Sequence, residues 1–250
     1  VSPDAMSGSF LGPSFSEKQV LNVIRNSHAV GKKLSDDELY KETARLLANG
    51  MIVGWFQGRM EFGPRALGGR SILADPRNRQ MQKKLNLEIK FRESFRPFAP
   101  SVLEEDVAEY FDPPFSSPYM LKVMEVNAKC REELPDNYAL LPYLDKLYCD
   151  RSYLQAITHV DFTARVQTVS MDTNPRYHKL LTAFRELTGC SVLVNTSFNV
   201  RGEPIVCTPE DAYRCFMSTG MDYLVINNRL FSKDDQPSEN KREIQSDWMD

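Results

Sequence analysis

Several signatures of common protein classes are missing from this sequence. The five cysteines are odd in number, widely spaced and without a CxxC pair, and the three histidines lie far from them. That pattern argues against a disulfide framework and against a zinc site. GxGxxG and the Walker phosphate loop are also absent, which leaves no support for a Rossmann dinucleotide site or a P-loop. We therefore expect reduced thiols, as in a cytoplasmic protein, and no metal ligands in this chain.

Long apolar runs are missing as well. No stretch approaches the roughly 18 to 20 apolar residues that a bilayer span requires, and the first residues lack the basic flank and apolar core of a secretory signal. With 250 residues, 42% of them hydrophobic and 26% charged, the composition is typical of a globular protein with a sizeable core. Because the chain begins at Val1 rather than Met, we expect a fragment or a processed chain.

The chain also lacks an overall positive charge. The 31 basic and 34 acidic residues give a formal net charge of -3, which argues against a dedicated nucleic-acid binder. Positive charge is nevertheless concentrated between residues 59 and 98, where ten basic residues accompany four acidic ones. Such a cluster within an acidic chain can focus a field on a small anionic ligand. For Arg79, Lys83 and Lys84, a solvated helix face is the simpler interpretation.

Strand and helix patterns alternate along the chain. Pairs such as Ser35 and Glu38 have the spacing of a capping box, and proline recurs at first helical positions. Two amphipathic helices follow residue 15, the second over 35–49, and further helices are predicted at 75–84, 174–189 and 208–220. The predicted strands cover 51–56, 71–74, 98–103, 119–126, 159–170, 191–195 and a hairpin of 222–227 with 229–232.

This alternation predicts an α/β or α+β domain with a mixed sheet. Residues 1–15, rich in Ser, Gly and Pro, are expected to be a linker or the end of a preceding domain. The folded domain is expected to span 16–232, and residues 233–250 form a polar tail.

A glycine-rich loop at residues 58–71 is the first candidate binding element. Its glycines allow main-chain N–H groups to approach a ligand closely, and Arg59, Arg65 and Arg70 carry planar forks that match phosphate oxygens. The alternative is an ordinary turn whose arginines extend into water. Three arginines and four glycines in fourteen residues favour an anion-binding loop.

A second basic element follows at residues 90–96. If this segment is extended, Lys90 and Arg92 share a face and point at one anion, while Phe91 turns toward the core. Arg96 comes shortly after. Taken alone, a K-x-R pair is equally compatible with a solvated strand edge.

Polar residues after the predicted strand 191–195 form a third candidate. Asn195 ends this strand, and Ser197 and Asn199 share a face if the chain stays extended, with Arg201 just beyond. Polar side chains at the carboxyl end of a central strand are where α/β sheets commonly bind ligands. Ordinary turn chemistry is the alternative.

The segment from residue 159 to 167 is the fourth candidate. On a strand, five polar side chains would share one face, too polar for a plain core: His159, Asp161, Thr163, Arg165 and Gln167. His159 could act as a base or a ligand, but a lone histidine is more often structural, which is the interpretation we favour.

Four ordered strings together indicate a family. EFGPRALGGRSILADPR, KFRESFRPFAPS, HVDFTARVQTV and VNTSFNVRGEPIVCTPEDA resemble the C-terminal region of the carbamoyltransferases that modify antibiotics and nodulation factors, over about residues 50–226. GSFLGPSFS resembles the segment that joins the two domains of that family. The resemblance implies a YrdC-like fold, a twisted mixed sheet flanked by helices.

The resemblance also implies a reaction. Members take carbamoyl phosphate and ATP to carbamoyl adenylate, and a metal-bearing N-terminal domain of the same protein, absent from this sequence, passes the carbamoyl group to a small-molecule acceptor hydroxyl. K-x-R and S-x-N pairs mark the catalytic site, which implies roles for Lys90, Arg92, Ser197 and Asn199. Mg²⁺ is expected to bridge the phosphates. The residues expected to bind phosphate or nucleotide, or to shape the loop that does, are Arg59, Arg65, Arg70, Arg96, Arg165, Asn195 and Arg201.

Two other functions stay open from the sequence. YrdC-like domains can hold RNA on a basic concave face, although the acidic balance and the scarcity of aromatic platforms count against RNA here. A degenerate domain could also serve only as a scaffold for its partner domain. Intact K-x-R and S-x-N pairs argue against degeneration.

Overall fold

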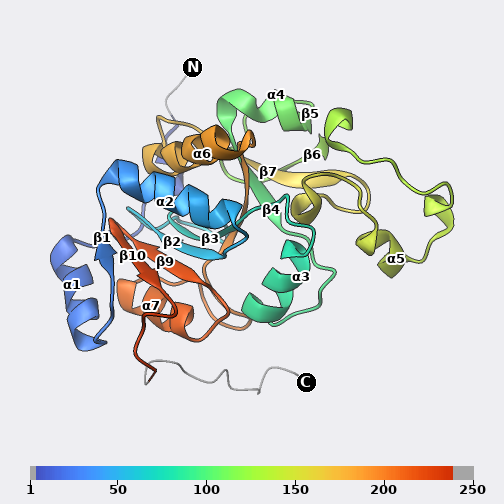
Figure 1. The fold of residues 1–250 in the computed structure, drawn as a ribbon. Helices are drawn as coiled ribbons and strands as arrows, with labels where there is room; N and C mark the ends of the chain where they lie inside the picture. Colours follow the sequence, from blue (N-terminus) through green and yellow to red (C-terminus); the bar gives the residue numbers. More distant parts are fainter. Residues whose placement is uncertain (1–3, 239–250) are drawn as a thin grey trace.

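Ten strands form one mixed sheet in residues 4–238, the part of the chain that the computed structural model describes (Figure 1). The strand order is β1-β10-β9-β2-β3-β8-β4-β7-β6-β5. β2 runs parallel to β9 and β4 parallel to β7, and the other paired neighbours are antiparallel. The strand bounds are β1 Lys32–Lys33, β2 Val53–Phe56, β3 Arg70–Ala74, β4 Ala99–Leu103, β5 Phe111–Asp112, β6 Lys122–Val126, β7 Thr163–Val169, β8 Val192–Ser197, β9 Tyr223–Ile226 and β10 Arg229–Ser232.

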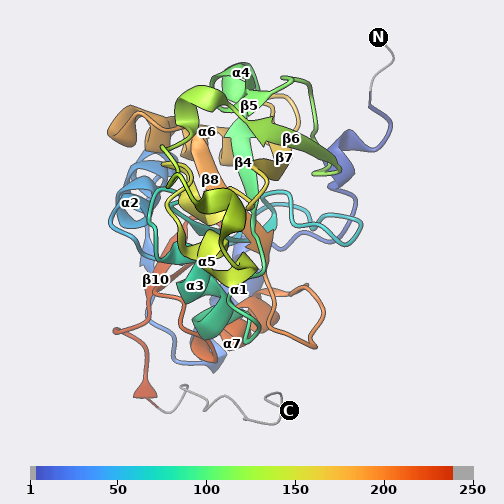
Figure 2. The same cartoon turned by 90° about the vertical axis from the view of Figure 1, so that its right-hand side faces the viewer.

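Helices pack on both faces of this sheet (Figures 1 and 2). α2 and α6 lie side by side over one face, and α1 packs with α7 on the other. α3 continues into a π-helical turn at Leu85–Ile89. The helix bounds are α1 Glu17–Asn26, α2 Asp36–Ala48, α3 Met81–Lys84, α4 Val107–Tyr110, α5 Tyr143–Tyr148, α6 Pro175–Thr188 and α7 Pro209–Met217. The mixed sheet flanked by helices that the sequence predicts is thereby confirmed.

Local capping chemistry sets several helix boundaries as predicted. Ser35 accepts from the Glu38 backbone N–H while the Glu38 carboxylate accepts from the Ser35 N–H, a complete capping box. α6 begins after Asn174, whose side chain accepts from the Tyr177 N–H, and ends at Gly189 with a left-handed φ of 76°. These interactions depend only on neighbouring residues, which is why the sequence predicts them.

The predicted helix at 75–84 is wrong in its start. The Asp75 carboxylate accepts from the Arg77 backbone N–H at 2.9 Å and from the Arg77 guanidinium at 2.6 Å. The Asn78 side chain likewise accepts from the Gln80 N–H. These side chains hold the backbone in turns instead of a helix, so α3 begins only at Met81.

The predicted strand at 159–170 is also shorter in the structure. β7 begins at Thr163, because the Asp161 carboxylate accepts from the Thr163 N–H and hydroxyl, and Phe162 takes a left-handed φ of 64°. His159 and Asp161 therefore lie in a turn and do not share a strand face with Arg165, which corrects the expected five-residue polar face.

Two segments outside the main layers affect the surroundings of the site. Residues 9–13 pair with the glycine-rich loop, with Gly12 N donating to Met60 O and Met60 N to Pro13 O, both at 2.9 Å. Residues 127–158 form an arm that contains α5 and projects to the side of the sheet (Figures 1 and 2). Most of the expected tail, positions 239–250, lies outside the described residues.

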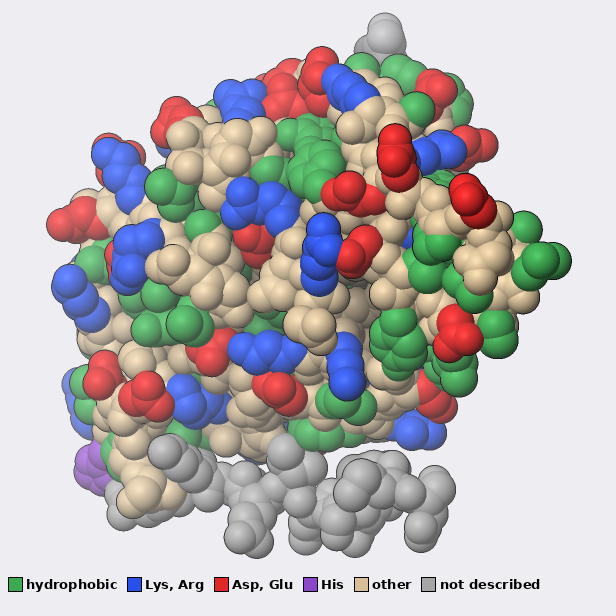
Figure 3. All heavy atoms as spheres, turned by 45° about the vertical axis from the view of Figure 1, so that its right-hand side comes forward, with side chains coloured by type: hydrophobic (Ala, Val, Ile, Leu, Met, Phe, Trp, Pro, Cys, Tyr) green, Lys and Arg blue, Asp and Glu red, His purple; other side chains and the backbone are tan. Residues whose placement is uncertain are grey.

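On the face of the molecule that Figure 3 shows, charged side chains are spread out, whereas apolar side chains gather in one region. Acidic and basic side chains are interspersed over this face, with no large area of one sign. Apolar side chains gather on the projecting arm, where Leu140 is 87% exposed and Tyr148 59% exposed. Between residues 4 and 238, no helix combines the length and the hydropathy needed to cross a bilayer.

Candidate functional site

The candidate site lies at one edge of the sheet, where β8 ends. β8 pairs with β3 on one side and β4 on the other, both antiparallel, so its carboxyl end meets their amino ends. Asn195 stands opposite Ala99 of β4, and Ser197 stands opposite Ser71 of β3. The sheet order therefore brings together chain segments that are far apart in the sequence.

The turn after β8 is anchored by the aromatic residue at its centre. Phe198 is fully buried, and a Cβ at position 54 would lie 2.8 Å from its Cζ, so Gly54 in β2 makes room for the ring. With Phe198 turned into the core, Ser197 and Asn199 face the same way, and the Ser197 hydroxyl donates to Asn199 Oδ1 at 2.7 Å. The predicted pairing of these two side chains is confirmed.

Lys90 joins the K-x-R and S-x-N pairs. Its ammonium donates to the Ser197 carbonyl at 2.5 Å, and to the carbonyl and Oδ1 of Asn199 at 2.9 Å each. Only 5% of Lys90 is exposed, and this burial lowers the pKa of its ammonium to about 7. Because its donors are used by the turn, the geometry gives Lys90 a positioning role for Ser197 and Asn199.

Arg92 does not point with Lys90, which corrects the extended geometry expected for residues 90–92. Lys90 has a helical backbone and Phe91 a left-handed φ of 45°, so the two cations diverge. The Arg92 Nε donates to Asn86 Oδ1 at 2.6 Å, and its guanidinium lies 5.0 Å from the centre of the Phe98 ring. These contacts direct Arg92 to the cavity beside β8.

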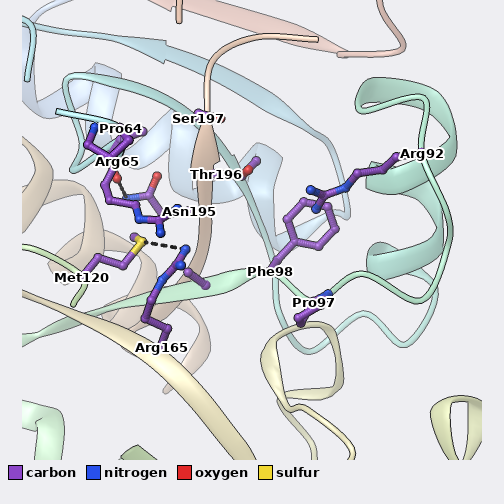
Figure 4. Close-up of a pocket in the computed structure, with 12 residues that line it drawn as sticks. Pro64, Arg65, Arg92, Pro97, Phe98, Met120, Arg165, Asn195, Thr196 and Ser197 are labelled. Carbon is purple, nitrogen blue, oxygen red and sulfur yellow. Dashed lines mark hydrogen bonds between the residues drawn. The ribbon is translucent and has the colours of Figure 1, made fainter. Parts of the chain in front are cut away.

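That cavity, of about 140 Å³, collects three of the predicted arginines (Figure 4). Arg65 comes from the glycine-rich loop, Arg165 from β7 and Arg92 from the segment after the π-helical turn. No ion pair joins any of them to a carboxylate in residues 4–238. The lining residues are Pro64, Arg65, Ala66, Arg92, Pro97, Phe98, Ala99, Met120, Arg165, Asn195, Thr196 and Ser197.

The electrostatics of the cavity favour an anion. Burial lowers the pKa of Arg165, and the neighbouring positive charge of Arg65 lowers it further. Burial lowers the pKa of Arg92 to about 10, which still leaves it charged at neutral pH. Like charges held close together, with no carboxylate paired to them in residues 4–238, raise the electrostatic energy of the site, and a bound anion would lower it.

The other predicted residues occupy different places. Arg96 lines a second cavity that shares Arg65, Arg92 and Arg165 with the first. Arg59 donates to Leu11 O and Arg201 is exposed in the following turn, and neither lines either cavity.

Arg70 also lies away from both cavities. It is fully buried, stacks 3.6 Å from the centre of the Phe56 ring, and donates to the carbonyls of Pro13, Gln57, Gly58 and Gly69. Burial lowers the pKa of its guanidinium to about 10. Arg70 thus shapes the glycine-rich loop, and its donors do not reach a phosphate in either cavity.

Glu61 is a site-building residue that the sequence analysis missed. It is 5% exposed, and its Oε1 accepts from the backbone N–H groups of Leu67, Gly69 and Arg70 at 2.7, 2.6 and 3.2 Å. These bonds fold the loop around one carboxylate and so fix the base of Arg65. The available signal was a single acidic residue in an otherwise basic, glycine-rich loop.

Asn195 belongs to a buried amide network behind the cavity. Its Nδ2 donates to Ala66 O, Ser101 Oγ and Gln167 Oε1 at 2.8 to 3.1 Å. Gln167 in turn donates to Leu67 O at 2.8 Å. The network ties β8, β4 and β7 to the glycine-rich loop. The part that Ser101 takes in it was not predicted from the sequence.

Comparison with known proteins identifies the family. Residues 44–233 match the family described as carbamoyltransferase C-terminus, and the chain belongs to this family, as the four sequence strings indicated. It is 41% identical over 229 residues to the nodulation protein NolO of Bradyrhizobium diazoefficiens, which covers 90% of this chain and 38% of that protein. Identity to the 3'-hydroxymethylcephem-O-carbamoyltransferase of Amycolatopsis lactamdurans is 38% over 194 residues, 78% of this chain and 33% of that one.

Other similar proteins extend this comparison. An uncharacterized protein of Synechocystis is 56% identical over 250 residues, which is 99% of this chain and 40% of that protein. The chain thus spans about two fifths or less of the length of these three relatives. Among solved structures, full-length HypF in its phosphate- and nucleotide-bound form matches 75% of this chain and 20% of that chain with a TM-score of 0.43 and 21% identity.

Proposed function

We propose that this chain supplies the adenylate-forming site of a carbamoyltransferase, which binds ATP and carbamoyl phosphate and forms carbamoyl adenylate. The observation that carries the proposal is the meeting of Arg65, Arg92 and Arg165 at one cavity without a carboxylate partner among the described residues. Both substrates present phosphate oxygens, for which guanidinium groups are matched partners. Family membership and the names of the relatives support the choice of carbamoyl transfer.

Formation of carbamoyl adenylate requires positive charge and precise alignment of the reacting groups. Carbamoyl phosphate and water give carbamate and phosphate. A carbamate oxygen then bonds to the α-phosphorus of ATP as the bond from that phosphorus to the pyrophosphate oxygen breaks. Several anionic oxygens approach one another, so neutralising charge and aligning nucleophile with phosphorus lower the barrier. Arg65, Arg92 and Arg165 supply the charge, while Ser197 and Asn199, held by Lys90, orient the donor or nucleotide.

Mg²⁺ fits this site as part of the nucleotide complex. Neither cavity is lined by Asp or Glu, so the ion would be held by the phosphate oxygens of ATP and not by this chain. Its chemistry is charge neutralisation at the phosphates.

The later transfer step belongs to other parts of the protein in this proposal. A metal-bearing N-terminal domain would pass the carbamoyl group from the adenylate to a small-molecule hydroxyl. The relative named for O-carbamoylation of 3'-hydroxymethylcephem supports a hydroxyl acceptor. The chain spans 33% of that relative, which leaves room there for such a domain.

Calorimetric titration with ATP and Mg²⁺ tests the binding site. We expect Arg92→Ala and Arg165→Ala to weaken ATP binding by about 1.5 to 3 kcal/mol each, or about 10- to 150-fold, as charge-assisted contacts are lost. Arg25→Ala, an exposed arginine on α1, is the matched control and should bind as the wild type does. Unchanged affinity in both cavity variants would overturn the site assignment.

A further inference from the structure

We propose that His159 is the general base for the hydrolysis of carbamoyl phosphate to carbamate, with Asp161 as its positioning residue. The inference rests on the proposed function, because it assigns a proton acceptor to that reaction. It reverses the structural role that the sequence favours for this histidine. The argument depends on three observations, which concern the turn, the cavity and the chemistry of the lining residues.

The turn before β7 builds a histidine–carboxylate pair. His159 Nδ1 lies 3.0 Å from Asp161 Oδ1, and the turn is closed by backbone bonds from His159 N to Thr163 O and from Phe162 N to His159 O. Asp161 Oδ1 also accepts from the Thr163 N–H at 3.0 Å and the Thr163 hydroxyl at 2.6 Å. The carboxylate is therefore held in place on both sides.

This arrangement fixes the imidazole tautomer. Burial raises the pKa of Asp161, but the bonds from Thr163 and His159 outweigh it and leave this pKa below its ordinary value. An ionised Asp161 accepts a hydrogen bond from Nδ1–H, which leaves Nε2 as the free acceptor. Among residues 4–238, none forms a hydrogen bond with His159 Nε2. A base oriented by a carboxylate in this way is a recurring catalytic arrangement.

The second cavity brings this base to the arginines. His159, with 33% of its side chain exposed, lines a cavity of about 370 Å³ together with Arg65, Arg92, Arg96 and Arg165. Three of these arginines line the first cavity too, so the two spaces share a wall of positive charge. A phosphate held by that wall has His159 on the same side.

His159 is the only described residue lining either cavity whose side chain can serve as a general base. The other ionisable residues that line them are arginines, which stay protonated and can only donate. Lys90 lies behind the cavities with its ammonium bonded to Ser197 and Asn199. Arg65, Arg92, Arg96, Arg165 and Asp161 are the charged groups around the imidazole.

The step balances without an additional reactant. The oxygen of a water molecule bonds to the carbamoyl carbon while His159 Nε2 takes one of its protons. The bond between that carbon and the phosphate oxygen breaks, and the histidine returns the proton to the departing phosphate. The products are inorganic phosphate and carbamic acid, which ionises to carbamate by releasing its remaining proton to solvent. No group is oxidised or reduced.

Phosphate release from carbamoyl phosphate tests the assignment in the 250-residue chain with ATP and Mg²⁺ present. Removing a general base commonly slows a reaction by about 100-fold or more, so His159→Asn should lower the rate of phosphate release to that extent. Its affinity for ATP and Mg²⁺ should stay at the wild-type value. Asp161→Asn should slow release less, and His28→Asn, an exposed histidine elsewhere, should not slow it.

A second readout separates a base from a structural residue. Ammonium bicarbonate at alkaline pH supplies carbamate directly, so it should restore pyrophosphate release by His159→Asn to near the wild-type rate.

The outcomes distinguish the two proposals. Two results would overturn the role of His159 and leave the proposed function standing, provided that the wild-type chain releases both phosphate and pyrophosphate. One is a normal rate of phosphate release by His159→Asn. The other is a slow His159→Asn variant whose pyrophosphate release ammonium bicarbonate fails to restore. A wild-type chain that neither binds ATP nor releases phosphate would overturn the proposed function itself.

Discussion

The ammonium of Lys90 lies 3.4 Å from the hydroxyl of Ser197, although 107 positions separate the two residues. The same ammonium contacts both oxygens of Asn199. Lys90 follows the π-helical turn and Ser197 ends β8, so the contact joins two separate parts of the fold. Its effect is to hold the S-x-N turn next to the arginine-lined cavity, which Ser197 lines, and this makes Lys90 a determinant of site geometry.

Burial of Lys90 predicts a pH dependence of stability. Its pKa falls from 10.5 to about 7 on folding, so between these values the unfolded chain binds a proton that the folded chain does not. The free energy of unfolding should therefore rise with pH in this window, by up to about 1.4 kcal/mol per pH unit. Below about pH 7 Lys90 is protonated in both states, so it should contribute no pH dependence there. Urea denaturation from pH 6.5 to 9.5 measures the rise.

The matched variants are Lys90→Met, which should lack this rise, and Lys83→Met, an exposed lysine on α3, which should keep it. If the free energy of unfolding rises with pH equally steeply in the wild type and in Lys90→Met, Lys90 is not the titrating group.

The carboxylate of Glu61 should prove necessary for the glycine-rich loop. Glu61→Gln replaces three charge-assisted bonds to backbone N–H groups by weaker neutral ones. We expect the free energy of unfolding to fall by about 1 to 3 kcal/mol and ATP affinity to fall as the loop that carries Arg65 loosens. Denaturation and calorimetry measure the two effects. Glu186→Gln, on the exposed side of α6, should change neither, and a fully stable Glu61→Gln with wild-type affinity contradicts this role.

Close packing of Gly54 against Phe198 predicts a compensating pair of substitutions. Gly54→Ala places a Cβ 2.8 Å from the Phe198 ring, and overpacking of this kind typically destabilises by about 1 to 3 kcal/mol. Because Phe198 sits between Ser197 and Asn199, ATP affinity should fall as well. Phe198→Leu in the same chain shortens the side chain and should recover part of the loss.

The double-mutant cycle gives the decisive quantity for this pair. Residues in contact show a coupling free energy of about 0.5 to 3 kcal/mol. We expect the double variant to lose less stability than the sum of the losses in the two single variants. Strictly additive effects of the two substitutions would mean that the ring does not respond to position 54.

The parts of the fold that were predictable from sequence depend on neighbouring residues. The capping boxes at Ser35 and Thr208 and the αL end of α6 at Gly189 are complete within a few positions. The same kind of local chemistry also misled the predictions where it was overlooked. Carboxylates at Asp75 and Asp161 close turns in segments that were predicted to be a helix and a strand.

The assembly of the site depends on contacts that sequence spacing does not contain. Strand order places β8 between β3 and β4, and this order decides that Asn195, Arg65 and Arg165 meet. The left-handed φ of Phe91 separates Lys90 from Arg92, which no period-2 pattern can reveal. The resemblance to the family predicted that arginines bind the phosphates. Only the structure shows that Arg65, Arg92 and Arg165 line the cavity while Arg70 shapes the loop.

The most direct test of the account is titration of the chain with ATP and Mg²⁺, with and without carbamoyl phosphate, followed by an assay of pyrophosphate release. We predict ATP binding that Arg92→Ala weakens about 10- to 150-fold, and pyrophosphate release that requires carbamoyl phosphate. Absence of ATP binding, with RNA instead held in a steeply salt-dependent manner, would contradict the account and favour an RNA-binding module.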